Sequence, residues 1–206
     1  MKMRGRLITF EGPEGGGKTT QIRKTALFLR KKGHAVLILR EPGGTKTGEA
    51  VRQILLDRKQ NRMTPQTELL LYLAARAQIV GEKILPALEK GIIVLLDRFE
   101  DSTVAYQGYG RGIPLNAIEM VSCSLVRGVL KPDLTVILDV DPALGLKRGG
   151  RHDRMERQSL AFHRKVRKGF ISIAKKDPRR CLVIDGALDK SAVFEHIRER
   201  VERVTS

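Results

Sequence analysis

The sequence contains no tryptophan, only two cysteines, and no apolar run that approaches the length of a membrane span. Disulfide-built proteins need many closely spaced cysteines, whereas Cys123 and Cys181 lie far apart and form no CxxC motif. A membrane-spanning helix needs about 20 consecutive apolar residues, and no apolar signal-peptide core follows the basic N-terminal residues. These absences exclude a disulfide scaffold and predict a cytoplasmic protein with reduced thiols and no membrane partner.

Acidic and aromatic residues are also scarce. The chain has 39 lysines and arginines against 23 aspartates and glutamates, a formal net charge of +16, and 4% aromatic residues. Such a charge attracts phosphate-bearing ligands or nucleic acid. Nucleic-acid-binding proteins usually gather their cations and add aromatic stacking surfaces, but the basic residues here are scattered. We therefore expect a phosphate-handling site and keep nucleic-acid binding only as an alternative.

Apolar runs and helical spacing alternate along the chain. They predict strands at 6–10, 35–39, 92–96, 134–138 and 181–184, and helices at 18–32, 47–57, 65–90, 115–130, 142–148, 157–176 and 189–204. Pro86 is expected to kink the helix over 65–90. Strands joined by helices indicate an α/β fold with a five-stranded parallel sheet flanked by helices. No linker or internal repeat interrupts the pattern, so residues 1–206 are predicted to form a single domain.

The turn after the first predicted strand matches the pattern GxxxxGKT, and it lies between a strand and a helix as this motif requires. Its glycines let several backbone N–H groups point at one phosphate, and the following helix adds positive potential. Lys18 is expected to reach the β- and γ-phosphates, and the Thr19 hydroxyl to bind Mg²⁺ with Asp97. We predict a P-loop NTPase fold in which ATP is bound by Gly12, Pro13, Glu14, Gly15, Gly16, Gly17, Lys18, Thr19 and Thr20.

Residues beyond this loop favour a kinase over a hydrolase. The NKxD motif with which GTPases read their base is absent. Arg98 directly follows Asp97, and a cation there suits a second phosphate group. Further polar clusters follow strand ends or lie on the long helix, where an open α/β sheet binds its ligands. These are residues 40–45, the pair Tyr72 and Arg76, and residues 97–107.

Several of these motifs together resemble the thymidylate kinase family. They are REPGGT at 40–45, DR-x3-S-x2-AYQ at 97–107, the Gly-rich loop at 12–20, and PDLTVILDV at 132–140 followed by GLKR at 145–148. The resemblance covers essentially the whole chain. It implies transfer of the γ-phosphoryl group of MgATP to dTMP, which gives dTDP and ADP for dTTP biosynthesis. It also implies a homodimer and a short mobile lid.

The resemblance also implies roles for individual side chains. Tyr72 would stack on the pyrimidine, Arg76 would bond the base edge, and Arg98 would hold the acceptor phosphate. Glu14 would meet the 3′-hydroxyl, and Tyr106 would pack under the sugar where a ribose 2′-hydroxyl would be crowded. The full expected acceptor set is Arg40, Glu41, Pro42, Tyr72, Arg76, Arg98, Ser102, Thr103, Tyr106 and Gln107.

The expected lid spans residues 147–158. The P-loop carries no arginine, whereas this segment carries Arg148, Arg151 and Arg154, as in the lid-arginine subgroup of the family. An arginine near the γ-phosphate stabilises the negative charge of the transferring group, so these three are expected to act in catalysis with Lys18, Glu14 and Arg98. Asp153 and Glu156 are expected to help orient Mg²⁺ or the lid arginines.

Two other functions stay open from the sequence. One is a different nucleoside monophosphate kinase or a deoxynucleoside kinase on the same fold. The other, from a different class, is a P-loop protein that binds nucleic acid and has lost kinase chemistry, which the net charge of +16 suggests. ADP release with a panel of acceptors separates these functions.

Overall fold

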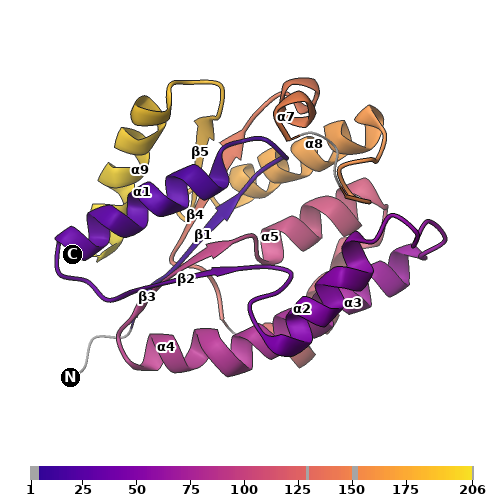
Figure 1. Ribbon diagram of the computed structural model, residues 1–206, viewed down its shortest axis with the longest axis horizontal. Coiled ribbons are helices and arrows are strands. Elements are labelled where there is room, and N and C mark those ends of the chain that lie inside the picture. Colours follow the sequence, from indigo (N-terminus) through magenta and orange to yellow (C-terminus); the bar gives the residue numbers. More distant parts are fainter. Residues whose placement is uncertain (1–4, 129, 150–152, 206) are drawn as a thin grey trace.

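A five-stranded, all-parallel sheet forms the centre of the computed structural model, which describes residues 5–128, 130–149 and 153–205 (Figure 1). Its strand order is β2-β3-β1-β4-β5. The strands are β1 (Leu7–Glu11), β2 (Val36–Arg40), β3 (Ile93–Asp97), β4 (Leu134–Asp139) and β5 (Cys181–Asp185). Each lies within one residue of its predicted bounds. The predicted α/β fold and parallel sheet are confirmed.

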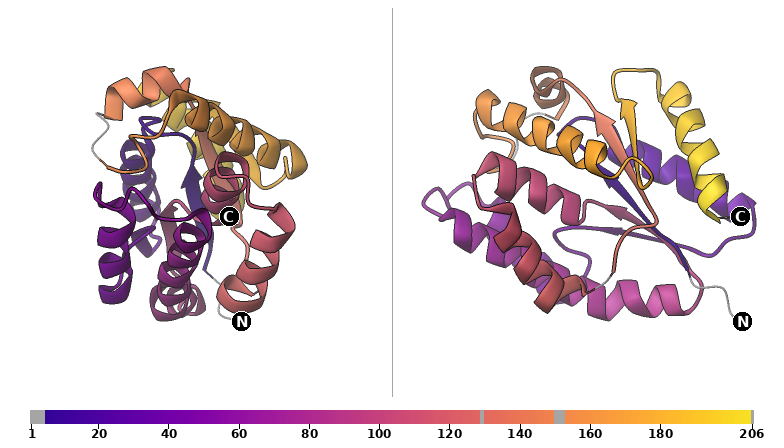
Figure 2. Two further views of the ribbon diagram at one scale, coloured as in Figure 1. Left: turned by 90° about the vertical axis from the view of Figure 1, so that its right-hand side faces the viewer. Right: turned by 180° about the vertical axis from the view of Figure 1, so that it is seen from behind.

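Helices cover both faces of the sheet, which explains the uninterrupted apolar runs of its central strands. On one face, Ile8 and Phe10 of β1 join a core with residues of α1 (Lys18–Lys31) and α9 (Lys190–Thr205). On the other face, Leu7 packs with residues of the segment Ile79–Leu88. Figure 2 shows the sheet between these two layers from the side and from behind. Thr9 and Glu11 alternate with Ile8 and Phe10 on β1 and therefore face the second layer.

The predicted helix over 65–90 is present but is not regular throughout. It consists of α3 (Pro65–Ile79), a π-helical segment η1 (Val80–Ile84) and α4 (Leu85–Glu89). Pro86 lies in the first turn of α4, directly after the wider π-helical turns of η1, and a proline is tolerated in a first helical turn. The helix predicted over 115–130 is likewise α6 (Leu115–Ser122) continued by η3 (Cys123–Arg127). It ends at Gly128, whose φ is +55°.

The remaining helical segments lie between the strands along the chain. They are α2 (Lys46–Leu56), α5 (Glu100–Thr103), η2 (Val104–Gly110), α7 (Pro142–Gly149) and α8 (Leu160–Lys176). The pair α5–η2 was not predicted, because residues 97–107 are too polar to show a helical apolar stripe. The helix expected to start at 157 starts instead after Ser159, whose hydroxyl caps it by accepting the Phe162 N–H. Of the described helices, none is long and apolar enough to cross a membrane.

Candidate active site

The P-loop connects β1 to α1 and is shaped by glycines. Gly12, Gly15 and Gly17 have φ values of +121°, +69° and +88°, which favour glycine over any residue with a side chain. A Cβ at Gly15 would lie 2.2 Å from the Gly145 carbonyl oxygen on α7, and one at Gly145 would lie 2.2 Å from the Glu14 carbonyl oxygen. The backbones of the loop and of α7 therefore touch directly, which leaves no room for a side chain at either glycine.

The start of α1 has the features of a phosphate-binding helix end. Its N-cap, Gly17, supplies no side-chain cap, so the first N–H groups of the helix stay free to bind an anion. Lys18 lies over the loop, where its Nζ donates to the carbonyl oxygens of Gly12 at 3.2 Å and Pro13 at 2.9 Å. Burial and then the nearby Arg98 lower the pKa of Lys18. The loop is thus a cationic, N–H-rich cradle that suits a polyphosphate.

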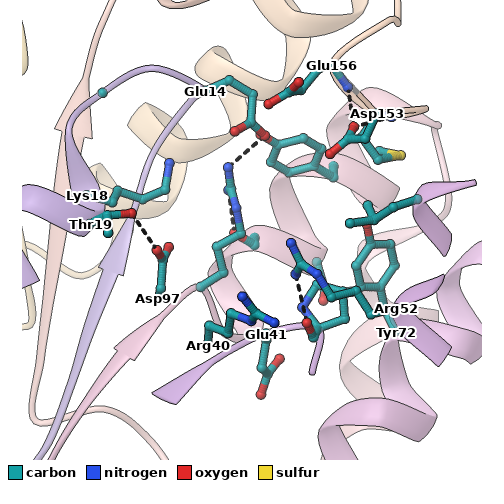
Figure 3. A pocket seen from close by; sticks show the side chains of 18 of the residues that line it. Glu14, Lys18, Thr19, Arg40, Glu41, Arg52, Tyr72, Asp97, Asp153 and Glu156 are labelled. Carbon is teal, nitrogen blue, oxygen red and sulfur yellow. Dashed lines mark hydrogen bonds and ion pairs between the residues drawn. The ribbon is translucent and has the colours of Figure 1, made fainter. Parts of the chain in front are cut away.

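The structure brings the two predicted Mg²⁺ ligands together at the edge of this cradle. The Thr19 Oγ1 lies 3.5 Å from the Asp97 Oδ2 (Figure 3). A hydroxyl and a carboxylate are hard oxygen ligands that fit Mg²⁺, which commonly keeps water and substrate phosphate oxygens in its other positions. Within the described residues there is no cluster of three or more His, Cys, Asp or Glu that could hold a metal by itself. The donor set therefore fits a metal that is shared with a nucleotide.

A cavity of about 330 Å³ opens beside the P-loop. Its walls come from the carboxyl ends of β2 and β3, from α3 and from the α5–η2 pair, as open α/β sheets predict. Most of the residues predicted for the site line this cavity. They are Glu14, Gly15, Gly16, Gly17, Lys18, Thr19, Thr20, Arg40, Glu41, Pro42, Tyr72, Arg76, Asp97, Arg98, Ser102, Thr103, Tyr106, Gln107, Asp153 and Glu156. Gly12 and Pro13 do not line it; they lie beneath Lys18.

Arg98 connects the P-loop to this cavity. Its Nη2 lies 2.7 Å from the Glu14 Oε1, and its guanidinium carbon lies 5.1 Å from the centre of the Tyr106 ring. The Tyr106 hydroxyl donates to the same Glu14 oxygen at 2.8 Å. Burial opposes ionisation of Glu14, but Arg98 and Lys18 outweigh it and lower the pKa of Glu14 to about 2. Glu14 is therefore a carboxylate at neutral pH, held between an arginine and a tyrosine.

Arg98 is also the one non-glycine residue with a positive φ, +70°, among the described residues. A side chain rarely adopts this left-handed conformation unless its surroundings impose it. The Arg98 N–H donates to the Phe10 carbonyl oxygen at 3.0 Å, and its Nη1 donates to the Ser102 Oγ at 3.1 Å and to the Gly12 carbonyl oxygen at 3.2 Å. The strained backbone aims the guanidinium across the end of the sheet, toward the P-loop.

Arg76 is almost completely buried and is hydrogen-bonded to side chains of the protein itself. It is 1% exposed, and its Nε and Nη2 donate to the Glu41 Oε2 at 2.8 and 2.7 Å. Its Nη1 donates to the Glu100 Oε2 at 2.9 Å and to the Thr103 Oγ1 at 2.8 Å. Arg76 still lines the cavity with Tyr72, as their spacing on one helix face predicts. Most of its donors, however, bond the protein's own side chains.

Three further predicted acceptor residues are also bonded within the protein. The Gln107 Nε2 donates to the Glu68 Oε1 at 2.9 Å. Arg40 is ion-paired with Glu49 at 3.0 Å on the exposed side of the site. The Ser102 hydroxyl accepts a hydrogen bond from Arg98, as described above. These residues line the cavity, and the same contacts fix its shape.

Of the three predicted lid arginines, the two that the structure describes, Arg148 and Arg154, occupy different places. Arg148 lies beside the P-loop, where its Nη1 donates to the Gly186 carbonyl oxygen at 3.0 Å and where it lines a neighbouring cavity with Gly15, Gly16 and Gly17. Arg154 is buried outside the main cavity. Its Nε donates to the Leu55 carbonyl oxygen at 2.8 Å, and its Nη1 lies 2.6 Å from the Glu68 Oε2. Arg151 lies outside the described residues.

The cavity also contains residues that the sequence analysis missed, namely Arg52, Leu56 and Met155. The Arg52 Nη1 donates to the Pro42 carbonyl oxygen at 2.8 Å, and Figure 3 shows Arg52 beside Tyr72. Arg52 and Leu56 lie four residues apart on α2, so they share one helix face. That spacing is ordinary in a surface helix, and it could not have distinguished them without the fold.

P-loop residues and arginines at the strand ends line the same cavity, and this combination defines a P-loop phosphotransferase. The family model described as thymidylate kinase matches residues 10–197. The chain belongs to the thymidylate kinase family.

Individual relatives agree with this assignment. A thymidylate kinase of Thermoanaerobacter sp. (strain X514) is 49% identical over 203 residues, covering 98% of this chain and 99% of the relative. One of Geobacter sulfurreducens is 50% identical, covering 97% and 99% respectively. The crystal structure of thymidylate kinase from Ehrlichia chaffeensis is 37% identical, with a TM-score of 0.78, covering 97% of this chain and 99% of that one. The expected family is thereby confirmed.

Proposed function

We propose that this chain transfers the γ-phosphoryl group of ATP to dTMP, giving ADP and dTDP. The observation that carries the proposal is the position of Arg98, which extends from the end of β3 between the P-loop and the adjoining cavity and is bonded to Glu14. A cation in that position neutralises repulsion between a bound nucleotide and a second, phosphate-bearing substrate. Membership of the thymidylate kinase family supports dTMP as that substrate.

On the donor side, the P-loop N–H groups and Lys18 bind the β- and γ-phosphates. Thr19 and Asp97 would hold Mg²⁺, which neutralises phosphate charge when bound. An oxygen of the acceptor phosphate forms the new bond to the γ-phosphorus, while the bond from that phosphorus to the β,γ-bridging oxygen breaks and ADP leaves. The acceptor phosphate is already ionised near neutral pH, so no general base is required. Catalysis rests on alignment and on positive charge at the transferring group.

On the acceptor side, Tyr72 stacks on the thymine, and Arg76 presents its cavity-facing edge to the base. Arg98 binds the acceptor phosphate, and Glu14 accepts a hydrogen bond from the 3′-hydroxyl. Tyr106 closes the sugar position. Its hydroxyl is held on Glu14 at 2.8 Å, so its ring is fixed where a ribose 2′-hydroxyl would be crowded. A deoxyribose preference follows from this fixed ring.

We further propose that residues 1–206 act as one domain with a lid over 147–158. Of the two lid arginines that the structure describes, Arg148, already beside the P-loop, is the better placed for the donor nucleotide. Arg154, bonded to Glu68 and to the Leu55 carbonyl oxygen, would reach the γ-phosphate only by leaving these contacts. Its observed position supports a role as the anchor of the lid.

The proposed assembly is a homodimer in the cytoplasm. Leu70 on α3 and Leu125 on η3 are 58% and 77% exposed, and Met120 on α6 is 65% exposed. Helix α3 packs against η3, so these apolar side chains lie on neighbouring helices, where a second copy could cover them. Cys123 and Cys181 are both unpaired thiols, which suits a reducing compartment.

The decisive experiment measures ADP release from MgATP with dTMP, dUMP, dCMP, dGMP and dAMP offered separately. We expect dTMP to give the highest rate. A higher rate with a purine acceptor would contradict the proposed pocket. A slow rate of ADP release that is the same with every acceptor, together with salt-sensitive binding to nucleic acid, would instead support the alternative of a P-loop protein that binds nucleic acid.

A further inference from the structure

Glu11, the last residue of β1, is a buried carboxyl for which the sequence suggested no role. It is 0% exposed and does not line the cavity. Its two oxygens each accept one hydrogen bond: Oε1 from the Phe99 N–H at 2.7 Å, and Oε2 from the Ser102 Oγ at 2.5 Å. Glu11 therefore fixes the first turn of the segment that follows Arg98, across the end of the sheet.

These two contacts of Glu11 restrain both the backbone and the side chain of Arg98. Phe99 is the next residue in the chain, so fixing its N–H restrains the strained peptide of Arg98, whose φ is +70°. Ser102 links Glu11 to the side chain, because its Oγ donates to Glu11 and accepts from the Arg98 Nη1 at 3.1 Å. A left-handed conformation at an arginine must be imposed by its neighbours. Glu11 is buried and contacts both Phe99 and Ser102, the two residues that restrain Arg98.

We propose that Glu11 is a positioning residue, which holds both the backbone and the guanidinium of Arg98 in the orientation that binds the acceptor phosphate. The inference rests on the proposed role of Arg98. It explains why a carboxyl is kept in the interior of the sheet, next to the carboxyl of Asp101. Burial and then Asp101 raise the pKa of Glu11 to about 8, although Ser102 and Arg98 oppose the shift. Glu11 does not line the cavity, so it acts through its hydrogen bonds and makes no contact with the substrate.

The test compares binding of dTMP with binding of thymidine, which lacks the phosphate, by calorimetry without ATP. It is run at about pH 9, above the pKa of about 8, where Glu11 is a carboxylate and accepts both hydrogen bonds. Glu11→Leu keeps most of the volume and removes both acceptors. We expect its affinity for dTMP to fall by about tenfold or more, as for the loss of one hydrogen bond between Arg98 and the acceptor phosphate. Its affinity for thymidine should stay nearly unchanged. Glu11→Gln keeps one acceptor oxygen, but its amide nitrogen cannot accept from Ser102. We expect a smaller loss, about threefold, again only for dTMP.

Thr9→Val is the matched control. Thr9 is also buried on β1, faces the same helix layer and bonds the Thr135 hydroxyl at 2.8 Å, but no bond links it to Arg98. We expect this variant to lose stability while keeping the wild-type ratio of dTMP to thymidine affinity.

Equal losses of dTMP and thymidine affinity in the Glu11 variants would overturn the inference, because they would indicate general loosening. A folded Glu11→Leu protein with wild-type dTMP affinity would overturn it as well. If Glu11→Leu does not fold, the Glu11→Gln variant is the test. A Glu11→Gln protein that loses no affinity for dTMP relative to thymidine would then overturn the inference. Wild-type protein that binds dTMP no more tightly than thymidine would instead overturn the role of Arg98, and with it everything built on that role.

Discussion

Replacing Arg98 by glycine and by alanine separates the two properties of this residue, its backbone and its guanidinium. At a φ of +70°, a residue with a Cβ bears a cost of roughly 1–2 kcal/mol that glycine avoids. Glycine loses about 0.5–1 kcal/mol more than alanine through the entropy of the unfolded chain. At the midpoints of these two ranges, the difference leaves Arg98→Gly more stable than Arg98→Ala by about 0.75 kcal/mol, the reverse of the usual order in regular structure.

The two variants should nevertheless lose the same activity, because both lack the guanidinium. A hydrogen bond to a charged group contributes about 1.5–3 kcal/mol, and a forked arginine makes two of them to a phosphate. Losing both corresponds to about 3–6 kcal/mol, or a fall of roughly 10²–10⁴ in kcat/KM for dTMP. The KM for ATP should change little, because the groups proposed to bind the donor phosphates are the P-loop N–H groups and Lys18.

Urea unfolding gives the stability of both variants, and coupled detection of ADP gives their kinetic constants. An alanine variant as stable as the glycine variant would refute the argument from backbone strain. Retention of near-wild-type kcat/KM for dTMP in either folded variant would refute the role of the guanidinium. A large difference in activity between the two would show that the backbone, rather than the missing group, controls the reaction.

Three further changes test other parts of the site. Lys18→Ala should lower kcat by about 10³-fold or more, because it removes the charge on the transferring group; turnover near the wild-type rate would exclude the P-loop assignment. Tyr106→Ala should narrow the ratio of kcat/KM for dTMP over its ribose analogue, and an unchanged ratio would disprove the steric account of sugar choice. Glu14→Gln tests the low pKa of this carboxyl, which falls from 4.5 to about 2 on folding. A depressed pKa gives stability that is present above pH 4.5 and lost as the pH falls toward 2, so acid unfolding should be less pH-dependent in the variant, by up to roughly 3 kcal/mol. Identical acid limbs of the unfolding curves would contradict the shift.

The sequence predicts the sheet and the P-loop well, because both depend on local pattern. Apolar runs mark strands that are buried on both faces, and the glycine spacing of the loop follows from backbone geometry. The α5–η2 helix could not be predicted in this way. Its residues face a polar site on one side, so Ser102, Thr103 and Gln107 stand where an apolar stripe would normally reveal a helix.

The pairing of buried charges could not be predicted either. Arg76 bonds Glu41 and Glu100, which are far from it in sequence, and only the fold brings them together. Arg154 was expected in the lid, near the donor phosphates, but lies against Glu68. A motif identifies the type of residue that the chemistry needs. Which of several arginines faces the cavity depends on acidic partners that come from other elements.

The contact between Gly15 and Gly145 constrains how this enzyme can change. A side chain at either position would meet the opposite carbonyl oxygen at 2.2 Å, so neither glycine can be replaced while α7 stays against the P-loop. Helix α7 leads directly into the proposed lid, and enlarging the loop would therefore displace the root of the lid as well. Any variant that moves a proposed catalytic arginine from the lid into the P-loop at Gly15 would have to rebuild α7 in the same step. Such a change is accessible through paired substitutions in laboratory evolution and is closed to a series of single ones.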